Sequence, residues 1–423
     1  MSLGRAHLLA SAAVREARRA GVAADALTWV GSLRRFAPDV GDVALLGVAP
    51  PSRHAHVLTA FSRLSFAAGV TALTRSSVTV DTARGPVTLH LAAPDQAGAA
   101  LVWHTGSRGH VDQLRLRADG LGVRFADGEI RRSTGASLVC ASEDELYAHL
   151  DLPHIPAELR SGDGEIDAAW AGRLPRLVSE VDIRGDLHTH SSWSDGQNTI
   201  ADVVSAARQL GYDYIAITDH SERARASRTL TPADVARQRE EIDTVRTGAR
   251  GMDVLHGIEV DIMHDGSLDF SDELLSGFDI VLASLHDPAG HDALRLTERY
   301  LRAIRHPLVN VITHPANRSP ARSDGYAVDF DRLFAAAADT GTAMEIDGAP
   351  GHLDMDGLVA RRAAAAGVTL VVDSDCHRVE ALARQMHFGI GTARRGWIEP
   401  RHVLNTRDVS AVRTFIARKR SGE

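Results

Sequence analysis

Lysine is almost absent from this chain of 423 residues, because Lys419 is its only lysine and every other basic residue is an arginine. Cysteine is also scarce: Cys140 and Cys376 are the only two, and they lie far apart. Such a pair excludes a disulfide framework and fits a reducing cytoplasm. The sequence has no run of 18 apolar residues and no secretory pattern at its N-terminus. We therefore expect a cytoplasmic protein without a membrane segment.

An excess of basic charge is missing as well. The formal net charge is −8; residues 1–180 hold 19 basic and 19 acidic residues, so the later residues, with 28 and 36, carry the whole excess. The chain has no basic tail, so its charge does not predict strong non-specific binding to nucleic acid. A locally basic groove is still compatible with these totals. The acidic excess in the second half suits a domain that collects divalent cations.

The length and the 44% hydrophobic content predict two domains rather than one. In the first part, residues 77–80 are expected to pair with residues 87–92 as a hairpin. Proline, glycine and acidic residues punctuate residues 153–175. We therefore expect one domain at 1–175 and a second at 180–423.

In the second part, short apolar runs alternate with helical stretches rich in Ala, Arg and Leu. This βαβα order predicts an α/β fold with a parallel sheet, either closed into a barrel or doubly wound. About seven β/α units fit, one fewer than in the eight-stranded barrel. The expected strands are 181–187, 213–218, 253–260, 278–285, 308–313, 342–346 and 368–373.

Most of these apolar runs end in a histidine or a carboxylate. Residues i and i+2 of a strand point the same way, so His188 and His190 share a face. In a parallel barrel all strand carboxyl ends open on one rim, where such side chains would converge. Imidazole and carboxylate together suit Zn, Mn or Fe, and two or three divalent ions are implied because one ion needs fewer ligands. The nine predicted ligands are His188, His190, Asp195, His220, Glu259, His286, His314, Asp375 and His377.

Other polar residues near these runs have more ordinary interpretations. Asp219 and Asp373 are expected to support the ligands rather than bind metal. Cys376 is expected to be a small buried hydrophobic residue. Capped or solvated side chains are expected for His154, His256, His264, His291, His306, His352, His387 and His402.

The strand-end motifs resemble those of the PHP (polymerase and histidinol phosphatase) domain over roughly residues 180–400. The matching stretches are 185–190, 194–196, 218–220, Glu259, His286, His314 and 375–377. The resemblance implies a distorted (β/α)7 barrel with a trinuclear metal site and phosphoesterase activity. The ligand sets that it implies are His188, His190, Glu259 and Asp375 for one ion, which would also be the catalytic residues; Glu259, His286 and His314 for a second; and Asp195, His220 and His377 for a third.

The N-terminal half resembles the palm and thumb of family X DNA polymerases. Residues 31–35 and 41–46 are similar to the palm motif, and residues 105–115 and 152–160 to the thumb region. Bacterial members of that family carry a C-terminal PHP domain in the same order. The resemblance implies a smaller α+β domain before the barrel.

Two departures from that family predict that polymerase activity is lost. Nucleotidyl transfer needs carboxylates that hold two Mg ions. The palm motif requires Asp-x-Asp, but Asp42 is followed by Ala44, and residues 87–91 contain no third aspartate. We also expect no room before residue 30 for the DNA-binding subdomain that precedes the palm.

Three functions are compatible with these patterns. The first is a phosphoesterase acting on a DNA 3′ end, as a 3′–5′ exonuclease or 3′-phosphatase. Arg318 and Arg322 could then bind the phosphate, although a surface salt bridge explains them equally well. The second is a phosphatase of a small phosphoester, similar to a histidinol phosphatase. The third is a non-enzymatic protein that binds DNA or a partner and is stabilised by metal.

Overall fold

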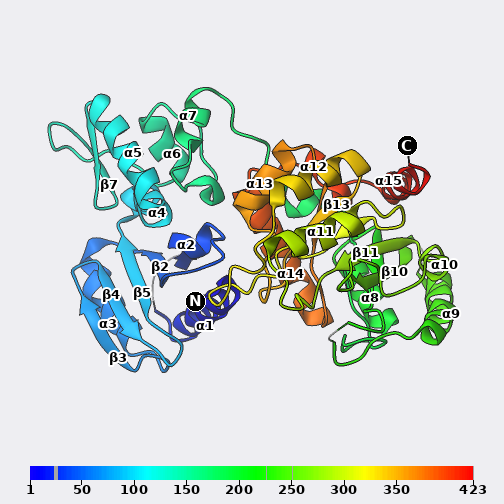
Figure 1. Ribbon diagram of the computed structural model, residues 1–423. Coiled ribbons are helices and arrows are strands. Elements are labelled where there is room, and N and C mark those ends of the chain that lie inside the picture. The colour runs from blue at the N-terminus through cyan, green and yellow to red at the C-terminus, as the bar shows by residue number, and fades with distance from the viewer. Residues whose placement is uncertain (23–26, 225, 250, 423) are drawn as a thin grey trace. The chain divides into compact units, whose positions relative to one another are not determined.

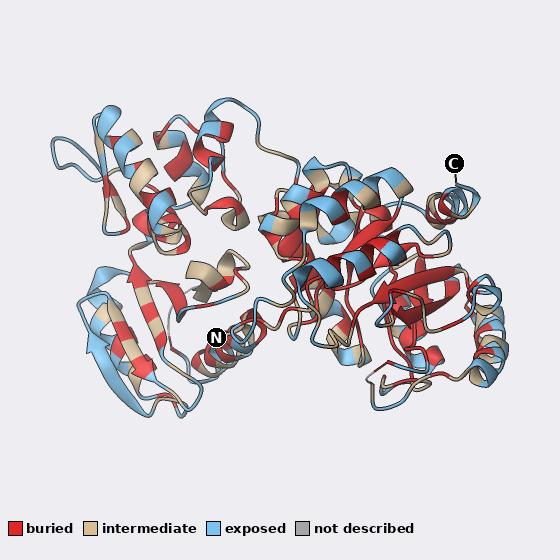
Figure 2. Cartoon of the chain, viewed as in Figure 1, coloured by how far each residue is buried: buried red, intermediate tan, exposed pale blue. Residues whose placement is uncertain are grey.

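The computed structural model describes residues 1–22, 27–224, 226–249 and 251–422, and the chain divides into two compact units (Figure 1). Unit 1 is Met1–Pro175 and unit 2 is Arg176–Glu423. Each unit buries its own apolar side chains (Figure 2), so each is described by itself.

Unit 1 is built on a five-stranded mixed sheet with the order β1-β2-β5-β4-β3. β2 and β5 run parallel, whereas the other neighbours run antiparallel. The predicted hairpin is confirmed, because Ser77 pairs with His90 and Val80 pairs with Val87. The strands are β1 (Leu27–Trp29), β2 (Val43–Val48), β3 (Gly69–Leu73), β4 (Ser77–Asp81) and β5 (Val87–Ala92).

The helices of unit 1 pack closely where α4 meets the start of α6. A Cβ at Gly98 would lie only 1.9 Å from the carbonyl oxygen of Ser142, so this contact requires glycine. Ser142 caps α6 and forms a reciprocal capping box with Glu145. The helices are α1 (Leu3–Arg19), α2 (Gly31–Arg34), α3 (His54–Ser62), α4 (Ala97–Thr105), α5 (Arg108–Gly120), α6 (Glu143–His149) and α7 (Glu165–Trp170), with a hairpin of β6 (Val123–Ala126) and β7 (Glu129–Arg132).

A partly buried network of ion pairs connects α2 to α6 in unit 1. Arg34 donates from both terminal nitrogens to the Glu143 carboxylate, at 2.8 and 2.7 Å. Arg160, which is fully buried, also donates to Glu143. Burial favours the neutral acid, but Arg34 and Arg160 outweigh it and lower the pKa of Glu143 to about 2.

Unit 2 is a nearly closed seven-stranded parallel barrel, which is one of the two arrangements that the alternating apolar runs predict. The strand order is β14-β13-β12-β11-β10-β9-β8, so each strand lies beside its neighbour in sequence. The first strand is shorter than its predicted run because residues 180–182 form a 3₁₀ turn. The strands are β8 (Gly185–Asp186), β9 (Tyr214–Ile217), β10 (Asp253–Asp261), β11 (Ile280–Ser284), β12 (Val311–Ile312), β13 (Ala343–Asp347) and β14 (Leu370–Asp373).

The barrel is nearly closed between its two edge strands. At the rim, Thr189 and Cys376 form a parallel bridge. Deeper in the seam, the side-chain amide of Asn405 donates to the carbonyls of Gly185 and Val372 at 2.9 and 2.6 Å. Its oxygen accepts from the Val372 amide at 3.0 Å. Asn405 thereby satisfies backbone groups that a broken sheet would leave unpaired.

Helices surround the barrel, and their outward faces are exposed (Figure 2). The barrel interior is apolar, with Leu255, Leu282 and Val371 packed against Val412 and Ile416 of the last helix. Among the helices formed by the described residues, none is both long and apolar enough to cross a membrane. The helices are α8 (Ile200–Gln209), α9 (Pro232–Gly248), α10 (Asp272–Leu275), α11 (Ala293–Ile304), α12 (Phe330–Thr340), α13 (Gly357–Ala365), α14 (Val379–Arg395) and α15 (Val409–Ser421).

Candidate metal centre

All nine predicted ligands lie at the carboxyl ends of the barrel strands. Glu259 is inside β10, near its end, and the other eight follow a strand directly or in the next loop. His188, His190 and Asp195 follow β8, His220 follows β9, His286 follows β11, His314 follows β12, and Asp375 and His377 follow β14. The rim therefore collects side chains from six strands.

Four ligand-type atoms face one point at this rim: Nε2 of His188, Nε2 of His190, Oε2 of Glu259 and Oδ1 of Asp375. The nitrogen-to-oxygen distances among them are 3.1–3.7 Å, and the two nitrogens are 3.1 Å apart. Ligands that sit about 2.1 Å from a tetrahedral ion lie about 3.4 Å from one another. The atoms of His188, His190 and Asp375 thus have the mutual spacing of a metal site, and Oε2 of Glu259 lies 3.5 and 3.6 Å from the two histidine nitrogens.

Glu259 borders a second group through its other oxygen. Its Oε1 lies 3.5 Å from Nε2 of His286 and 3.0 Å from Nε2 of His314. Its Oε2 faces the first group. One buried carboxylate therefore lies between two sets of imidazoles.

A third group forms around Asp195. Its Oδ1 lies 3.6 Å from Nε2 of His220 and 3.2 Å from Nε2 of His377. The ring of His190 stacks on His377 with centroids 4.2 Å apart, and a His190 nitrogen lies within 4.8 Å of the ligand atoms of the other three. These clusters of histidine and carboxylate are able to hold metal ions.

The pKa shifts of the rim residues follow from burial and from the close approach of carboxylates and imidazoles. Burial favours neutral Glu259, but the charges of His220 and His188 hold the pKa of Glu259 well below its usual range. Burial opposes protonation of His188 too, yet Glu345 and Glu259 raise the pKa of His188 well above its usual value. By contrast, burial together with His377 lowers the pKa of His190 to about 3. Divalent cations would supply the positive charge that protonated imidazoles otherwise provide.

Two carboxylates that the sequence analysis missed support these histidines. Oε1 of Glu345 lies 2.6 Å from Nδ1 of His188, and its Oε2 accepts from the His314 amide at 2.7 Å. Oδ1 of Asp261 lies 3.1 Å from Nδ1 of His286. A carboxylate on Nδ1 fixes the ring and leaves Nε2 free to bind metal. The sequence around the run at 342–346 does point to Glu345. Glu345 and Asp347 are two residues apart at the end of this run, as His188 and His190 are after the first run.

Asp219 supports the loop that follows β8. Its carboxylate accepts from the amide and the hydroxyl of Ser191, from Ser194, and from the side chain of Gln238. This agrees with a supporting role rather than a ligand role. Cys376, as predicted, is buried in an apolar cluster.

His352 is not the capped or solvated residue that the sequence predicts. Its ring stacks on His314, with centroids 5.1 Å apart and planes 22° apart. It also offers a ligand atom within 4.8 Å of atoms of Asp347 and Asp375. His352 lies in the loop after β13, several residues past the strand end, where no periodic pattern marks it. Burial and the charge of His314 lower the pKa of His352 to about 4.

The two arginines proposed as phosphate ligands have different environments. Arg318 is buried, with Nη1 3.4 Å from Oδ2 of Asp356. Arg322 is exposed. The structure therefore brings only Arg318 into a packed environment beside the rim loops.

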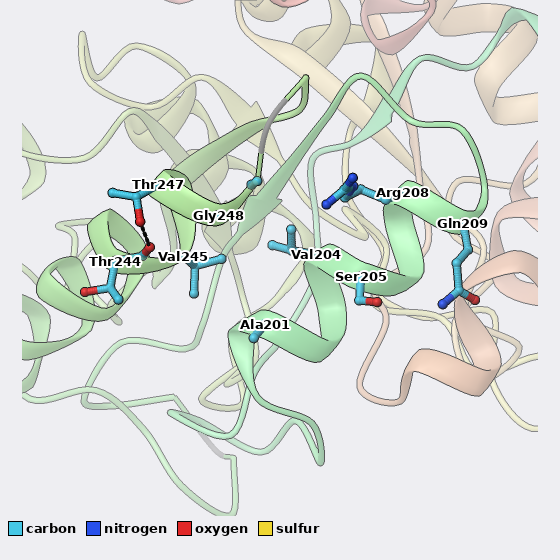
Figure 3. A pocket seen from close by; sticks show the side chains of 10 residues that line it. Ala201, Val204, Ser205, Arg208, Gln209, Thr244, Val245, Thr247 and Gly248 are labelled. Carbon is cyan, nitrogen blue, oxygen red and sulfur yellow. Dashed lines mark hydrogen bonds between the residues drawn. The ribbon is translucent and has the colours of Figure 1, made fainter.

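A separate hollow of about 560 Å³ lies between α8 and α9 (Figure 3). The side chains of Arg208, Ser205 and Thr247 are among its lining. No histidine or carboxylate lines it among the described residues, so this hollow is distinct from the rim centre.

Each of the two units contains a stretch that matches a known protein family. Residues 186–315 match the PHP domain family, and residues 100–161 match the DNA polymerase beta thumb. A protein named "DNA polymerase/3′-5′ exonuclease PolX" from Bacillus subtilis is 35% identical over 78% of this chain. The chain spans 58% of the length of that protein.

Two further relatives match over a smaller share of this chain. A "probable phosphatase" of Shewanella oneidensis is 34% identical over 45% of this chain and 75% of its own length. A "probable phosphatase" of Thermoanaerobacter sp. is 29% identical over 56% of this chain and 95% of its own length. With its parallel barrel and its rim of histidines and carboxylates, the chain belongs to the PHP domain family.

Proposed function

We propose that the chain is a metal-dependent phosphoesterase whose rim residues hold divalent ions of Zn, Mn or Fe. The observation that carries this proposal is the 3.1–3.7 Å spacing between the Nε2 atoms of His188 and His190 and the carboxylate oxygens of Glu259 and Asp375. These four would hold one ion. Glu259 would bridge to a second, held with His286 and His314, and Asp195, His220 and His377 would hold the third.

The residues of the chain have separate tasks in this proposal. Bound divalent ions would activate water and neutralise the charge that develops on phosphate. Glu345 holds the ring of His188, and Asp261 holds the ring of His286, so that each Nε2 points to the centre. Arg322, which is exposed, would bind a substrate phosphate, and Arg318 would position the loop that carries it.

A DNA 3′ end is the substrate that we favour. The relative named a 3′-5′ exonuclease aligns over 78% of this chain, which is more than unit 2 alone could supply. Polymerisation would be lost, because Ala44 of β2 lies beside Thr88 of the parallel strand β5. His90 follows on β5 and stacks on His104 at 3.9 Å. These side chains cannot hold the two Mg ions that nucleotidyl transfer needs.

A small phosphoester is the second candidate substrate. Relatives named as probable phosphatases match over 75% and 95% of their own lengths, an extent that a single barrel domain would fill. The near-neutral first half of the chain also gives no electrostatic preference for DNA.

The test is a turnover assay of the full chain with Mn²⁺. The substrates are single-stranded DNA, 3′-phosphorylated DNA and a panel of small phosphoesters, and the variant is His188→Ala. We expect hydrolysis of DNA 3′ ends that falls at least about 100-fold in the variant, because a ligand of the metal is removed. The matched control is His56→Ala, which alters an exposed histidine of unit 1.

The outcomes separate the candidates. Turnover of small phosphoesters alone would favour the second substrate class. Bound metal without turnover on any substrate would favour a non-enzymatic role. Equal activity of His188→Ala and the parent chain would contradict the proposed centre.

A further inference from the structure

A cluster outside the nine predicted ligands lies where β13 and β14 end at the rim. Asp347 is the last residue of β13, His352 lies in the loop that follows, and Asp375 follows β14. β13 and β14 are paired in register up to Asp347 and Asp373, so their ends are adjacent. Asp347, His352 and Asp375 each offer one ligand atom, and these atoms lie within 4.8 Å of one another.

The Asp347 carboxylate is incompletely satisfied. Its side chain is fully buried, and Oδ1 accepts from the Ala349 amide at 2.6 Å. Its Oδ2 is buried without a hydrogen-bond partner among the described residues. A buried carboxylate beside a second carboxylate is costly unless positive charge or a proton lies between them.

A cation in this cluster needs a set of converging lone pairs. The Oδ2 of Asp347, which has no hydrogen-bond partner among the described residues, can offer one. The imidazole of His352 offers another ligand atom, and its Nδ1 is also buried and without a hydrogen-bond partner.

We propose that Asp347, His352 and Asp375 bind a further divalent cation, of the manganese or zinc class, beside the nine-residue centre. Two carboxylates and one imidazole suit Mn²⁺ best and Zn²⁺ next. Asp375 would also bind the first ion of the proposed function. Because it shares this ligand, the inference rests on the proposed function. Asp347 and His352 belong to none of the three ligand sets already described.

The experiment counts Mn²⁺ on the full chain. Metal-free protein is equilibrated with saturating Mn²⁺ by dialysis, and bound metal is measured by mass spectrometry for the parent, Asp347→Asn and His352→Gln. We expect each variant to bind about one equivalent less than the parent, because each removes one of three ligands. The control is Asp356→Asn, which changes a carboxylate of the same loop that caps α13.

A second measurement guards against variants that fold poorly. An anomalous-scattering map of the Mn-loaded parent crystal should contain a peak between Asp347, His352 and Asp375. Equal Mn²⁺ content in the parent and both variants, or no peak at that position, would overturn this inference while the nine-residue centre stays loaded. A parent chain that binds no Mn²⁺ at all would overturn the proposed function together with it.

Discussion

Glu259 is the residue on which the two best-formed groups of the rim depend. One of its oxygens faces His188 and His190, and the other faces His286 and His314. Its side chain is fully buried, so its charge is not screened by water. In the proposed centre, this single carboxylate would couple the occupancy of two metal positions.

Glu345 supports His188 through a contact that joins residues far apart in the sequence. We predict that Glu345→Gln lowers Mn²⁺ affinity about 10–100-fold, as loss of a supporting carboxylate typically does. The cause is the contact with His188 Nδ1 at 2.6 Å, which orients the ring. Isothermal titration of metal-free protein measures the change, and Glu240→Gln, an exposed substitution on α9, is the control. Unchanged affinity in Glu345→Gln would show that His188 is held by other contacts.

Glu143 gives a prediction for unit 1 that involves no metal. Glu143→Gln should destabilise unit 1 by about 3–5 kcal/mol at pH 7, because it leaves the buried Arg160 without its charge partner. Urea unfolding measures this loss. The control is Glu129→Gln, which breaks an exposed pair with Arg131 worth at most about 1 kcal/mol.

The pH dependence of the Glu143 effect has a defined sign. The pKa of Glu143 is about 2 in the folded chain against an ordinary 4.5, so its stabilising contribution is complete above pH 4.5. The difference between parent and variant should shrink as pH falls from 4.5 towards 2. A difference that stays constant over that range would mean that Arg34 and Arg160 do not hold the carboxylate ionised.

At the scale of elements, the rim residues that the sequence could predict are those that directly follow a strand. His188 and His190 were predictable because a short apolar run leads directly into them, and parallel strands end on one rim. His352 was not, because it reaches the rim from a loop with no periodicity. The short length of β8 was also hidden, since its seam contacts come from Asn405, more than 200 residues away.

Asn405 carries the element-scale prediction. Asn405→Ala removes three hydrogen bonds between the edge strands β8 and β14. Three buried backbone groups are left unpaired at about 1–3 kcal/mol each, so we expect a total loss of at least about 3 kcal/mol. For unit 2, at roughly 2–4 °C per kcal/mol, this lowers the melting temperature by at least about 6 °C. Thr414→Ala, at an exposed site on α15, should leave it nearly unchanged.

At the scale of the whole molecule, the two units have separate cores and separate sources of stability. Unit 1 is built on a mixed sheet and contains the ion-pair network of Glu143. Unit 2 is built on a barrel, and buried carboxylates lie at its rim. The sequence predicts a boundary near residue 175, where the pattern of apolar runs changes, and the compact units of the structure are Met1–Pro175 and Arg176–Glu423. The supporting contacts within each unit were not predictable, because they join residues far apart in sequence.

Metal binding should therefore stabilise one unit only. We predict that calorimetry of the full chain resolves two transitions and that Mn²⁺ raises only the transition of unit 2. At a free Mn²⁺ concentration of 100 times Kd the gain is about 2.7 kcal/mol for one ion, or roughly 5–10 °C. Asn405→Ala identifies the transition of unit 2 by lowering it, and Glu143→Gln identifies that of unit 1. Excess chelator should reverse the shift, whereas an equal response of both transitions to Mn²⁺ would place the bound metal outside the barrel rim.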